Sequence, residues 1–542
     1  MKAARTTILE LIRRTSAALP PDVATVLELN RALEQSGSRA DFALDLVHAN
    51  IGLARRLSAP ICQDTGTINF YIATPVGFDQ MAFEEQIAAA IREATDLGYL
   101  RQNSVDSLTG RNSGDNLGPG SPVIHWHQHR SDTVDVRLIL KGGGCENMSA
   151  QYSLPATLST GRRADRDLAG VYACILDAVW QAQGKGCGPG FLGVCIGGDR
   201  ASGYDFAKEQ LLRELDDTNP VPELAALEAR VLDEANRLNI GPMGFGGRLT
   251  VGSCKIGTRN RLPASFFVSV AYMCWAYRRR GVILDPATGA AQRWLYELPG
   301  EFDQRAESDE PATIVDLGLR GRKAIRLRTP LSESDVRGLH AGDVVLLSGT
   351  VFTGRDAVHQ YLHKGGELDV LKNAVIYHCG PVVLDNRVPA QGEGLPEQDP
   401  EAAGQHSQQP VRLNGPEERF RVIAAGPTTS IREEPYQAGV IERYGIKAVI
   451  GKGGMGPKTL EACRKFGCVY LHAVGGAAQV YARCVRSVPN VYLREFGSPE
   501  AVWEMVVEDF PAVVTMDAHG RSLHQEVADE SRERLQAVLA GA

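Results

Sequence analysis

The sequence predicts an α/β protein with two domains. Segments with helical periodicity alternate along the chain with short apolar segments that end in glycine, a pattern typical of helices that connect strands. The length of 542 residues exceeds that of most single domains. At 297–312 the composition turns acidic and contains proline, as linkers between domains often do. We therefore place one domain at 1–300 and the second at 313–542.

In the N-terminal domain, predicted helices and strands follow one another closely. Apolar residues recur at helical spacing in 81–100 and in 222–238, and a proline suited to a helix start opens the second segment. The apolar runs at 136–140 and 191–198 each lead into glycines and are predicted strands. Residues 1–20 have the pattern of an amphipathic helix and lack the long apolar stretch of a signal peptide.

In the C-terminal domain, the same alternation continues after one interruption. A low-complexity segment at 388–410 is rich in Gly, Pro, Gln and Glu, and we expect it to be a flexible surface loop. We see no internal repeat. Predicted strands lie within 342–352, 421–430, 447–451, 468–476 and 512–517.

Charge and hydropathy bear on the partners of the protein. The net charge of −7 does not favour a nucleic-acid-binding surface. No apolar run approaches the roughly 18 residues of a membrane span, and the composition, 43% apolar and 23% charged, is that of a soluble globular protein. We therefore expect a cytoplasmic protein without nucleic-acid or membrane partners.

Eleven cysteines are scattered along the chain. No two form a CxxC pair, so the spacings typical of zinc ribbons, thioredoxins and ferredoxins are absent. Most buried thiols pack as small apolar groups, as we expect for Cys174 within an apolar run. A cluster site assembled from cysteines distant in sequence remains open on this evidence.

A glycine-rich turn at 451–456 matches the GxGxxG pattern between a predicted strand and a predicted helix. A dinucleotide site also needs an acidic residue about 20 positions further on, and no Asp or Glu occurs between Glu461 and Glu495. Pro457 also breaks the spacing of a P-loop. We therefore do not favour a nucleotide-dependent oxidoreductase.

Three histidines alternate in the segment IHWHQH: His125, His127 and His129. On a strand they would share one face and could bind a transition metal. Because no carboxylate stands near them in the sequence, we favour a half-exposed end of a strand.

Seven glycine-rich turns each hold one or two reactive side chains. Together they supply thiolates for iron, Arg and Lys for carboxylates, and an Asp near hydroxyls for proton transfer. Any one of them alone would be read as a tight loop, but seven with complementary chemistry favour a catalytic site. The turns lie at 62–66, 111–116, 141–148, 186–190, 349–356, 426–432 and 450–454.

With these turns in this order, the chain resembles the class I, iron–sulfur fumarate hydratases and the related iron–sulfur tartrate dehydratases. The resemblance runs from ICQDTGT at residue 61 to DFPAVVTMDAHG near the C-terminus, and the two halves, separate subunits in some members, are fused here. It implies an N-terminal α/β cluster-binding domain, a C-terminal swivelling β/β/α-type domain, an active site in the cleft between them, and a homodimer.

The resemblance also implies a [4Fe–4S] cluster held by three cysteines. The residues that match the family's ligands are Cys62, Cys187 and Cys274. Three thiolates leave one iron open as a Lewis acid for a substrate oxygen. We interpret Cys145 and Cys195 as packing thiols.

The family's reaction adds water across the double bond of a four-carbon dicarboxylate, most simply fumarate to (S)-malate. By resemblance, Thr428 is the base and Asp64 activates it. One alternative is the dehydration of tartrate or of a substituted malate, as in mesaconate hydration. An alternative from another class is an iron–sulfur sensor, which would need no carboxylate-binding cations. The matched substrate-binding residues are Gln63, Arg101, Gly143, Gly144, Arg355, Arg432 and Lys452.

Two departures from the family pattern stand out. Leu262 occupies the position, twelve residues before Cys274, where the family usually has a histidine. We expect this leucine to line the cleft and to favour a substrate with an apolar substituent. The stretch TTSIREEPY also differs from the usual arginine–methionine–aspartate run after the threonines.

Overall fold

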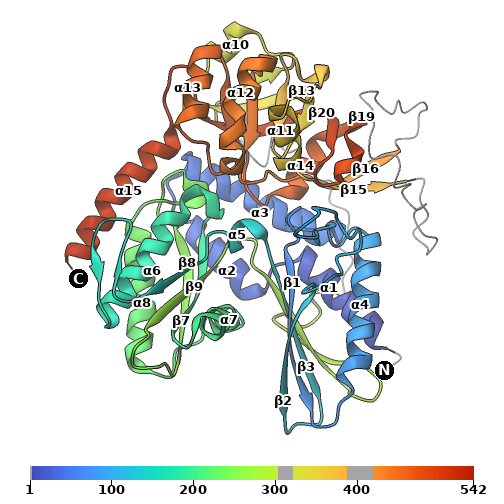
Figure 1. Ribbon diagram of the computed structural model, residues 1–542, viewed down its shortest axis with the longest axis vertical. Coiled ribbons are helices and arrows are strands. Elements are labelled where there is room, and N and C mark those ends of the chain that lie inside the picture. Colours follow the sequence, from blue (N-terminus) through green and yellow to red (C-terminus); the bar gives the residue numbers. More distant parts are fainter. Residues whose placement is uncertain (1–2, 303–321, 387–418, 542) are drawn as a thin grey trace.

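The computed structural model describes residues 3–302, 322–386 and 419–541 and confirms the α/β class (Figure 1). Helices and strands alternate through both halves of the described chain. Most of the predicted boundary at 297–312, and all of the predicted loop at 388–410, lie outside the described residues.

A five-stranded sheet forms one part of the N-terminal half. Helices α1 (Ala4–Ala17) and α4 (Gln80–Asp96) contact each other, and their apolar faces share one core with the sheet, because Ile8, Phe83 and Ile87 are buried against its strands. The order of its strands is β11 (Ala291–Leu295), β10 (Arg278–Leu284), β3 (Val134–Lys141), β1 (Thr67–Pro75) and β2 (Val123–His129).

A four-stranded sheet forms the other part of this half. Its helices are α6 (Leu168–Ala182), α7 (Arg200–Gln210) and α8 (Pro222–Arg237), and a two-stranded pair, β5 (Ala156–Thr157) and β6 (Arg163–Ala164), lies beside α6. Helices α2 (Pro21–Arg31), α3 (Arg39–Leu57) and α5 (Gly143–Glu146) complete the half. The order of the strands is β4 (Ala150–Ser153), β9 (Phe267–Met273), β7 (Gly190–Gly197) and β8 (Val251–Arg259).

The C-terminal half contains a seven-stranded mixed sheet. The seven strands in order are β12 (Ile325–Arg328), β13 (Val344–Thr353), β14 (Val375–Tyr377), β17 (Ala448–Gly451), β18 (Val469–His472), β20 (Val502–Met516) and β19 (Val485–Tyr492). Strand β20 pairs with both β18 and β13, so that β13, β14, β17, β18 and β20 close into a ring. A separate pair is formed by β15 (Val382–Asp385) and β16 (Phe420–Ala424).

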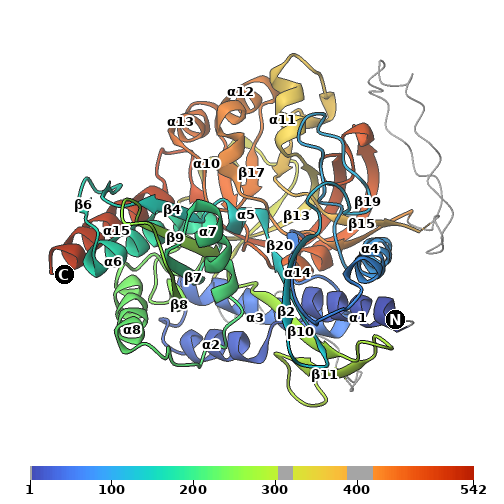
Figure 2. The same cartoon turned by 60° about the horizontal axis from the view of Figure 1, so that its bottom comes forward.

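Helices of the C-terminal half both cover its sheet and reach the N-terminal half. The helices are α10 (Glu333–Arg337), α11 (Asp356–His363), α12 (Glu434–Tyr444), α13 (Pro457–Phe466), α14 (Ala478–Cys484) and α15 (Leu523–Ala540). Helix α14 contacts α3, where the Asn50 amide donates to the Gly476 carbonyl oxygen (3.4 Å) and accepts from the Gln479 N–H (2.7 Å). Helix α15 packs along α6 (Figures 1 and 2).

The predicted elements are confirmed where the structure describes them. Segments 81–100 and 222–238 form α4 and α8, and the N-terminal amphipathic segment forms α1. The seven predicted strands correspond to β3, β7, β13, β16, β17, β18 and β20. None of the described helices is long and apolar enough to cross a lipid bilayer.

Candidate active site

The three predicted ligand thiols lie in one hydrophobic core although they come from separate elements. Cys62 lies in the loop between α3 and β1, Cys187 directly follows a 3-10 turn at Gln183–Gly186, and Cys274 follows the end of β9. All three side chains are buried and none is in a disulfide.

Close backbone packing fixes Cys187 in a conformation that is unusual for a residue with a side chain. Its φ is 50°, in the left-handed region, where strained residues are often found at functional sites. A Cβ on Gly475 would lie 2.4 Å from the Cys187 Sγ, and one on Gly186 would lie 2.7 Å from the ring of Tyr272. Positions 186 and 475 therefore both require glycine, one before Cys187 in the chain and one packed against its sulfur.

Lys452 connects the thiols to the C-terminal half. Its Nζ donates a hydrogen bond to the Cys187 Sγ (2.9 Å), and its backbone N–H donates to the Thr428 carbonyl oxygen (3.2 Å). Burial would lower the pKa of Lys452, but the Cys187 and Cys62 thiols outweigh it and raise the pKa above its usual range. Lys452 therefore stays an ammonium ion beside the sulfurs.

The two cysteines interpreted as packing thiols lie in the same hydrophobic core as the three predicted ligand thiols. Cys145 on α5 is buried, and the neighbouring Cys274 side chain lowers its pKa, while burial acts in the opposite direction. Cys195 lies within β7 and donates to the Gly197 carbonyl oxygen, as a packing thiol can. The interpretation of both as packing thiols stays a prediction.

The donor set fits an iron–sulfur cluster better than a single metal ion. Within the described part of the chain, no three or more His, Cys, Asp or Glu side chains converge closely enough to hold one ion. A cluster does not need such convergence, because each thiolate binds a different iron. Three buried thiols near Lys452 supply the soft, anionic ligands that iron–sulfur clusters require.

Asp64 lies among cations. Its Oδ1 is 3.3 Å from the Arg101 Nη2, and its backbone oxygen accepts from the Arg278 Nη2 (2.8 Å). Burial would raise the pKa of Asp64, but Arg101, Lys452 and Arg278 outweigh it and hold the pKa at about 2. Asp64 is therefore a carboxylate at any physiological pH.

Gln63 positions the turn that carries Thr428. Its Nε2 donates to the Pro427 carbonyl oxygen (3.0 Å), and its Oε1 lies so close to Gly426 that a Cβ there would be 2.0 Å away. The Cys62 Sγ also approaches the Gln63 Oε1 (3.5 Å). The side chain of Gln63 thus joins a thiol of the N-terminal half to the loop of the C-terminal half.

Thr428 lies in the loop after β16 with its hydroxyl beside a cation. The Arg432 Nη2 donates to the Thr428 Oγ1 (3.2 Å), and the Thr428 N–H donates to the His378 carbonyl oxygen (2.7 Å). No hydrogen bond joins Asp64 to Thr428 within the residues that the structure describes. The activation of Thr428 by Asp64 therefore stays a prediction.

The two arginines of the C-terminal half are paired with carboxylates. The Arg432 Nη2 is 3.0 Å from the Asp356 Oδ2, and the Arg355 Nη2 is 3.1 Å from the Glu500 Oε1. Arg101 of the N-terminal half contacts this half through the Gly380 carbonyl oxygen, which accepts from its Nη1 (2.9 Å). A Cβ on Gly380 would lie 2.4 Å from the Arg355 Nη1, so this glycine lets the two arginines lie close to one backbone segment.

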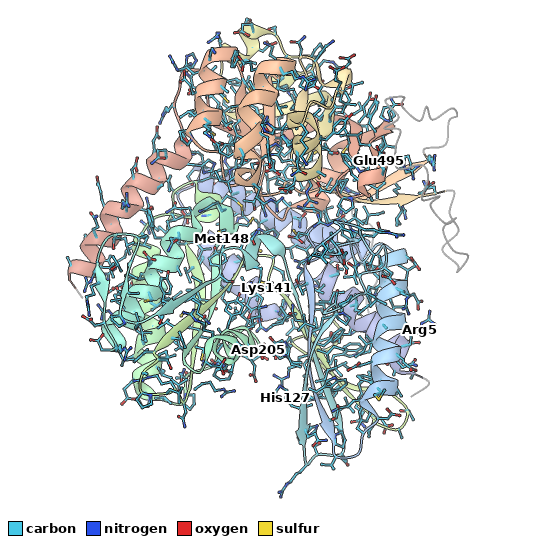
Figure 3. The ribbon with its side chains drawn as sticks, viewed as in Figure 1. Arg5, His127, Lys141, Met148, Asp205 and Glu495 are labelled. Atoms are coloured by element: carbon cyan, nitrogen blue, oxygen red, sulfur yellow. The ribbon has the colours of Figure 1, made fainter. Side chains whose placement is uncertain are left out.

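The glycines at 142–144 border Asp64 and Lys452. A Cβ on Gly142 would lie 3.2 Å from the Asp64 Oδ2, and one on Gly143 would lie 3.8 Å from the same atom. A Cβ on Gly144 would lie 3.5 Å from the Lys452 Nζ and 3.4 Å from the hydroxyl of Thr429. The predicted substrate-binding backbone is therefore next to the predicted machinery. Figures 1 and 2 show α5, which begins in this segment, at the centre of the molecule, and Figure 3 shows the flanking Lys141 and Met148 there.

Two residues of this site were missed by sequence reasoning. Arg278, fully buried at the start of β10, has an Nη1 without a hydrogen-bond partner among the described residues. Three consecutive arginines in an apolar strand were a usable signal, since buried charges need partners. The fully buried Glu433 has its Oε1 3.8 Å from the Arg432 Nη2, and neither of its carboxyl oxygens has a hydrogen-bond partner among the described residues.

The expectation for Leu262 is wrong for this chain. Its side chain is 74% exposed, in the loop between β8 and β9. Strand β9, which spans seven residues or roughly 20 Å in extended form, separates this loop from Cys274. Leu262 thus does not line the site within one chain, and it carries no argument about the substrate.

The two other motifs have structural roles. His125, His127 and His129 lie on β2, a half-exposed strand as expected; His125 stacks on Tyr71, and the His129 Nε2 bonds to the Ala73 carbonyl oxygen. Figure 3 shows His127 well below Lys141. The glycine-rich turn at 451–456 carries Lys452 between β17 and α13.

Comparisons with known proteins find relatives for nearly the whole chain. Residues 5–283 match the family model described as "Fumarate hydratase (Fumerase)", and residues 298–396 and 390–527 match the one described as "Fumarase C-terminus". A protein named "Putative fumarate hydratase class I" from Geobacillus stearothermophilus is 50% identical over 97% of this chain and 96% of its own length.

Relatives with a different substrate in their names match the two halves separately. The L(+)-tartrate dehydratase subunit beta of Escherichia coli (strain K12) is 33% identical over 39% of this chain and 92% of its own. The "Putative L(+)-tartrate dehydratase subunit alpha" of Methanocaldococcus jannaschii is 31% identical over 50% of this chain and 94% of its own. The resemblance to both groups is confirmed.

Proposed function

The chain belongs to the class I fumarate hydratase family, and from this premise we propose that it is a hydro-lyase that interconverts fumarate and (S)-malate with a [4Fe–4S] cluster. The observation that carries the proposal is Lys452. This one buried residue hydrogen-bonds the Cys187 thiol through its side chain and the Thr428 loop through its backbone, so a cluster ligand and the candidate base belong to one site.

We propose that Cys62, Cys187 and Cys274 hold the cluster. When bound, the cluster would supply a Lewis-acid iron that polarises a substrate oxygen. Burial raises the pKa of Cys187 to about 11 despite Lys452. Since metal binding requires the thiolate, the ammonium group of Lys452 compensates part of the charge that these ligands bring into the core.

The cations of the site fit a dicarboxylate. Arg355 and Arg432 lie at the C-terminal side, and Arg101 and Lys452 lie near Asp64. Guanidinium groups bind carboxylates with charge-assisted, often bidentate hydrogen bonds. Two such groups can orient the substrate and stabilise the charge that develops when a proton leaves the carbon next to a carboxylate.

Thr428 is the proposed acceptor of that proton. A threonine hydroxyl is a weak base in water, but Arg432 donates to the Thr428 Oγ1 and would stabilise its alkoxide form. The Asp64 carboxylate is the proposed partner that takes up the hydroxyl proton once substrate closes the distance, since catalytic hydrogen bonds often tighten only in the complex. Gln63 and the glycines at 142–144 fix the positions of both residues.

The proposal also covers the domains, the oligomeric state and the location of the protein. We place a cluster domain at 1–300 and a swivelling base domain at 313–542, with the site between them. A homodimer and a cytoplasmic location, both expected from the sequence, belong to the same proposal. An iron–sulfur sensor is less consistent with the site, because a sensor needs no set of buried cations for carboxylates.

Tartrate is the second candidate substrate, since both subunits named as tartrate dehydratases match this chain. The test is anaerobic reconstitution with iron and sulfide, followed by the kinetics of fumarate, mesaconate and L(+)-tartrate. We expect fumarate hydration, seen as loss of the enoate absorbance, to have the highest kcat/KM, and the Cys187→Ser variant to show none. A cluster-loaded protein that turns over tartrate but not fumarate would replace the main proposal with the second.

A further inference from the structure

A buried polar network lies behind the residues proposed to bind and deprotonate the substrate. His359 on α11, His378 after β14, Gln437 on α12 and Ser430 are all fully buried. The Gln437 amide lies 2.9 Å from the Nε2 of both histidines, and the His378 Nδ1 lies 2.7 Å from the Ser430 Oγ. Because buried polar groups destabilise a fold unless their partners are placed accurately, this network fixes the backbone that it joins.

One end of the network holds the backbone of Arg355. The His359 Nδ1 lies 2.9 Å from the Arg355 carbonyl oxygen, which also accepts from the His359 N–H (2.9 Å). Arg355 is the N-cap residue of α11, and His359 stands one turn further on. The imidazole ring therefore holds the first turn of the helix at the residue that carries the guanidinium group.

The other end holds the loop of Thr428. The His378 carbonyl oxygen accepts from the Thr428 N–H (2.7 Å), and Ser430, two residues further on, bonds the ring of the same histidine. The Ser430 N–H donates to the Lys452 carbonyl oxygen (3.1 Å), and a Cβ on Gly451 would collide with the Ser430 hydroxyl. The loop is thus attached to His378 at two points, through its backbone and through a side chain.

The hydrogens of the network follow from which groups can only accept. The Arg355 carbonyl oxygen is such a group, so the His359 Nδ1 carries a hydrogen. Burial lowers the pKa of both histidines, which keeps their rings neutral. The His359 Nε2 must then accept, so the amino group of Gln437 faces both rings and donates to each. In the opposite orientation this amino group has no partner among the described residues.

We propose that His359, Gln437 and His378 form one positioning unit for catalysis. The unit holds Arg355, the proposed partner of a substrate carboxylate, at a fixed distance from the base Thr428. The inference rests on the proposed function, because it presupposes the roles of these two residues. If they moved relative to each other, the bound substrate would move relative to its base, and a shift of about 1 Å can lower a rate by about 100-fold. The His359 end therefore acts mainly on binding, and the His378 end mainly on proton removal.

The first test measures KM and kcat for fumarate in the anaerobically reconstituted enzyme. His359→Leu should raise KM about 10-fold with a smaller change in kcat, and His378→Leu should lower kcat about 10- to 100-fold with a smaller change in KM. An asparagine places an amide donor where the histidine Nδ1 stands, so His359→Asn and His378→Asn should recover most of each loss. Asn variants as impaired as the Leu variants would overturn the inference. The control is His363→Asn, an exposed residue one turn after His359 on α11, which should match the wild type.

Gln437→Glu separates positioning from packing, because it keeps the shape of the side chain. A glutamate, ionised or protonated, cannot donate to both rings. We therefore expect this variant to keep the cluster absorbance, to raise KM and to lower kcat. Wild-type kinetics in Gln437→Glu would refute the positioning unit. A fall in kcat that only matches a loss of cluster, at an unchanged KM, would show a packing role and refute it as well.

Succinate, a dicarboxylate without the double bond, gives a measurement that needs no turnover. Its Kd for the cluster-loaded protein, measured by calorimetry, should rise in His359→Leu by the same factor as KM and stay unchanged in His378→Leu. An equal Kd in His359→Leu and the wild type would refute the role of His359. If the cluster-loaded wild type hydrates no fumarate, the proposed function fails; if it does and the variants match His363→Asn, only the positioning unit fails.

Discussion

The N-terminal and C-terminal halves of the site hold their reactive groups in different ways. The N-terminal half contributes buried thiols on glycine-rich turns, where a neighbouring Cβ would collide with sulfur or with an aromatic ring. The C-terminal half contributes arginines that are already paired, Arg432 with Asp356 and Arg355 with Glu500. The first set requires a cofactor to have chemistry at all, whereas the second set is positioned in advance for a charged ligand.

This difference predicts that variants of the two halves fail in different ways. Loss of an N-terminal thiol should remove the site, and loss of a C-terminal side chain should leave the cofactor and reduce rate or affinity.

The largest effect is expected from the ligand thiols. Cys62→Ser, Cys187→Ser and Cys274→Ser should each abolish the iron–sulfur absorbance and the activity after anaerobic reconstitution, since three thiolates are needed to hold the cluster. The control is Cys174→Ser, a buried thiol of α6 in a separate core, which should retain both. A full cluster in any of the three variants would contradict the ligand assignment.

The next effect concerns the proposed base. Thr428→Ala and Asp64→Asn should keep the cluster absorbance but lower kcat by about 10²–10⁴-fold, the usual cost of removing a general base. Steady-state kinetics alongside the visible spectrum would separate the two readouts. Normal turnover in Thr428→Ala would end this mechanism, and loss of the cluster in that variant would break the division between the halves.

A smaller effect is expected at the arginines. Arg432→Met should raise KM roughly 10- to 100-fold, because it removes a charge-assisted hydrogen bond worth about 1.5–3 kcal/mol. Some loss of kcat should accompany it, since Arg432 also donates to Thr428. The control is Arg443→Met on the nearby α12, where the arginine pairs with Glu367 at the surface; its kinetics should match the wild type.

Much of this site could be predicted from sequence because its chemistry is local to short turns. Cys62, Gln63 and Asp64 are neighbours in one turn, and the structure brings them next to Lys452 and the turn before Thr428. Helices and strands followed from periodicity, which depends only on which face of each element is buried. The colinear order of the turns then indicated that they converge.

What could not be predicted depends on distances across the fold. Nothing in the spacing showed that α5, which carries Cys145, would pack against β9, which Cys274 follows. The position of Leu262 was predicted wrongly because its nearness to Cys274 in sequence was taken for nearness in space. Twelve residues separate it from Cys274 in sequence, but an extended strand converts that separation into a long distance, whereas a loop could have folded back.

The smallest effect concerns Glu433, which the family pattern does not include. Its carboxyl group is fully buried beside Arg432, and burial, followed by the charge of Asp356, raises its pKa to about 8 from an ordinary 4.5, while Arg432 and Arg355 act in the opposite direction. Tyr470 also faces it. Glu433 is therefore neutral in the folded protein at pH 7 and becomes a carboxylate only in alkaline solution.

Ionisation of Glu433 would add a negative charge next to two arginines that bind the substrate, so KM for the dicarboxylate should rise as the pH passes about 8. The same shift affects stability. Between pH 4.5 and about 8 the unfolded state has lost this proton and the folded state has not, so stability falls as pH rises through this window.

Glu433→Gln cannot ionise, so its KM should lack this alkaline rise, and its thermal midpoint should gain on the wild type from about pH 5 to pH 8. The control is Glu442→Gln, an exposed carboxylate of α12, which should follow the wild type. If KM rises equally in the wild type and in Glu433→Gln, the charge of this carboxyl group does not affect substrate binding by the C-terminal arginines. Their positioning then depends on Asp356 and Glu500, not on this carboxyl group.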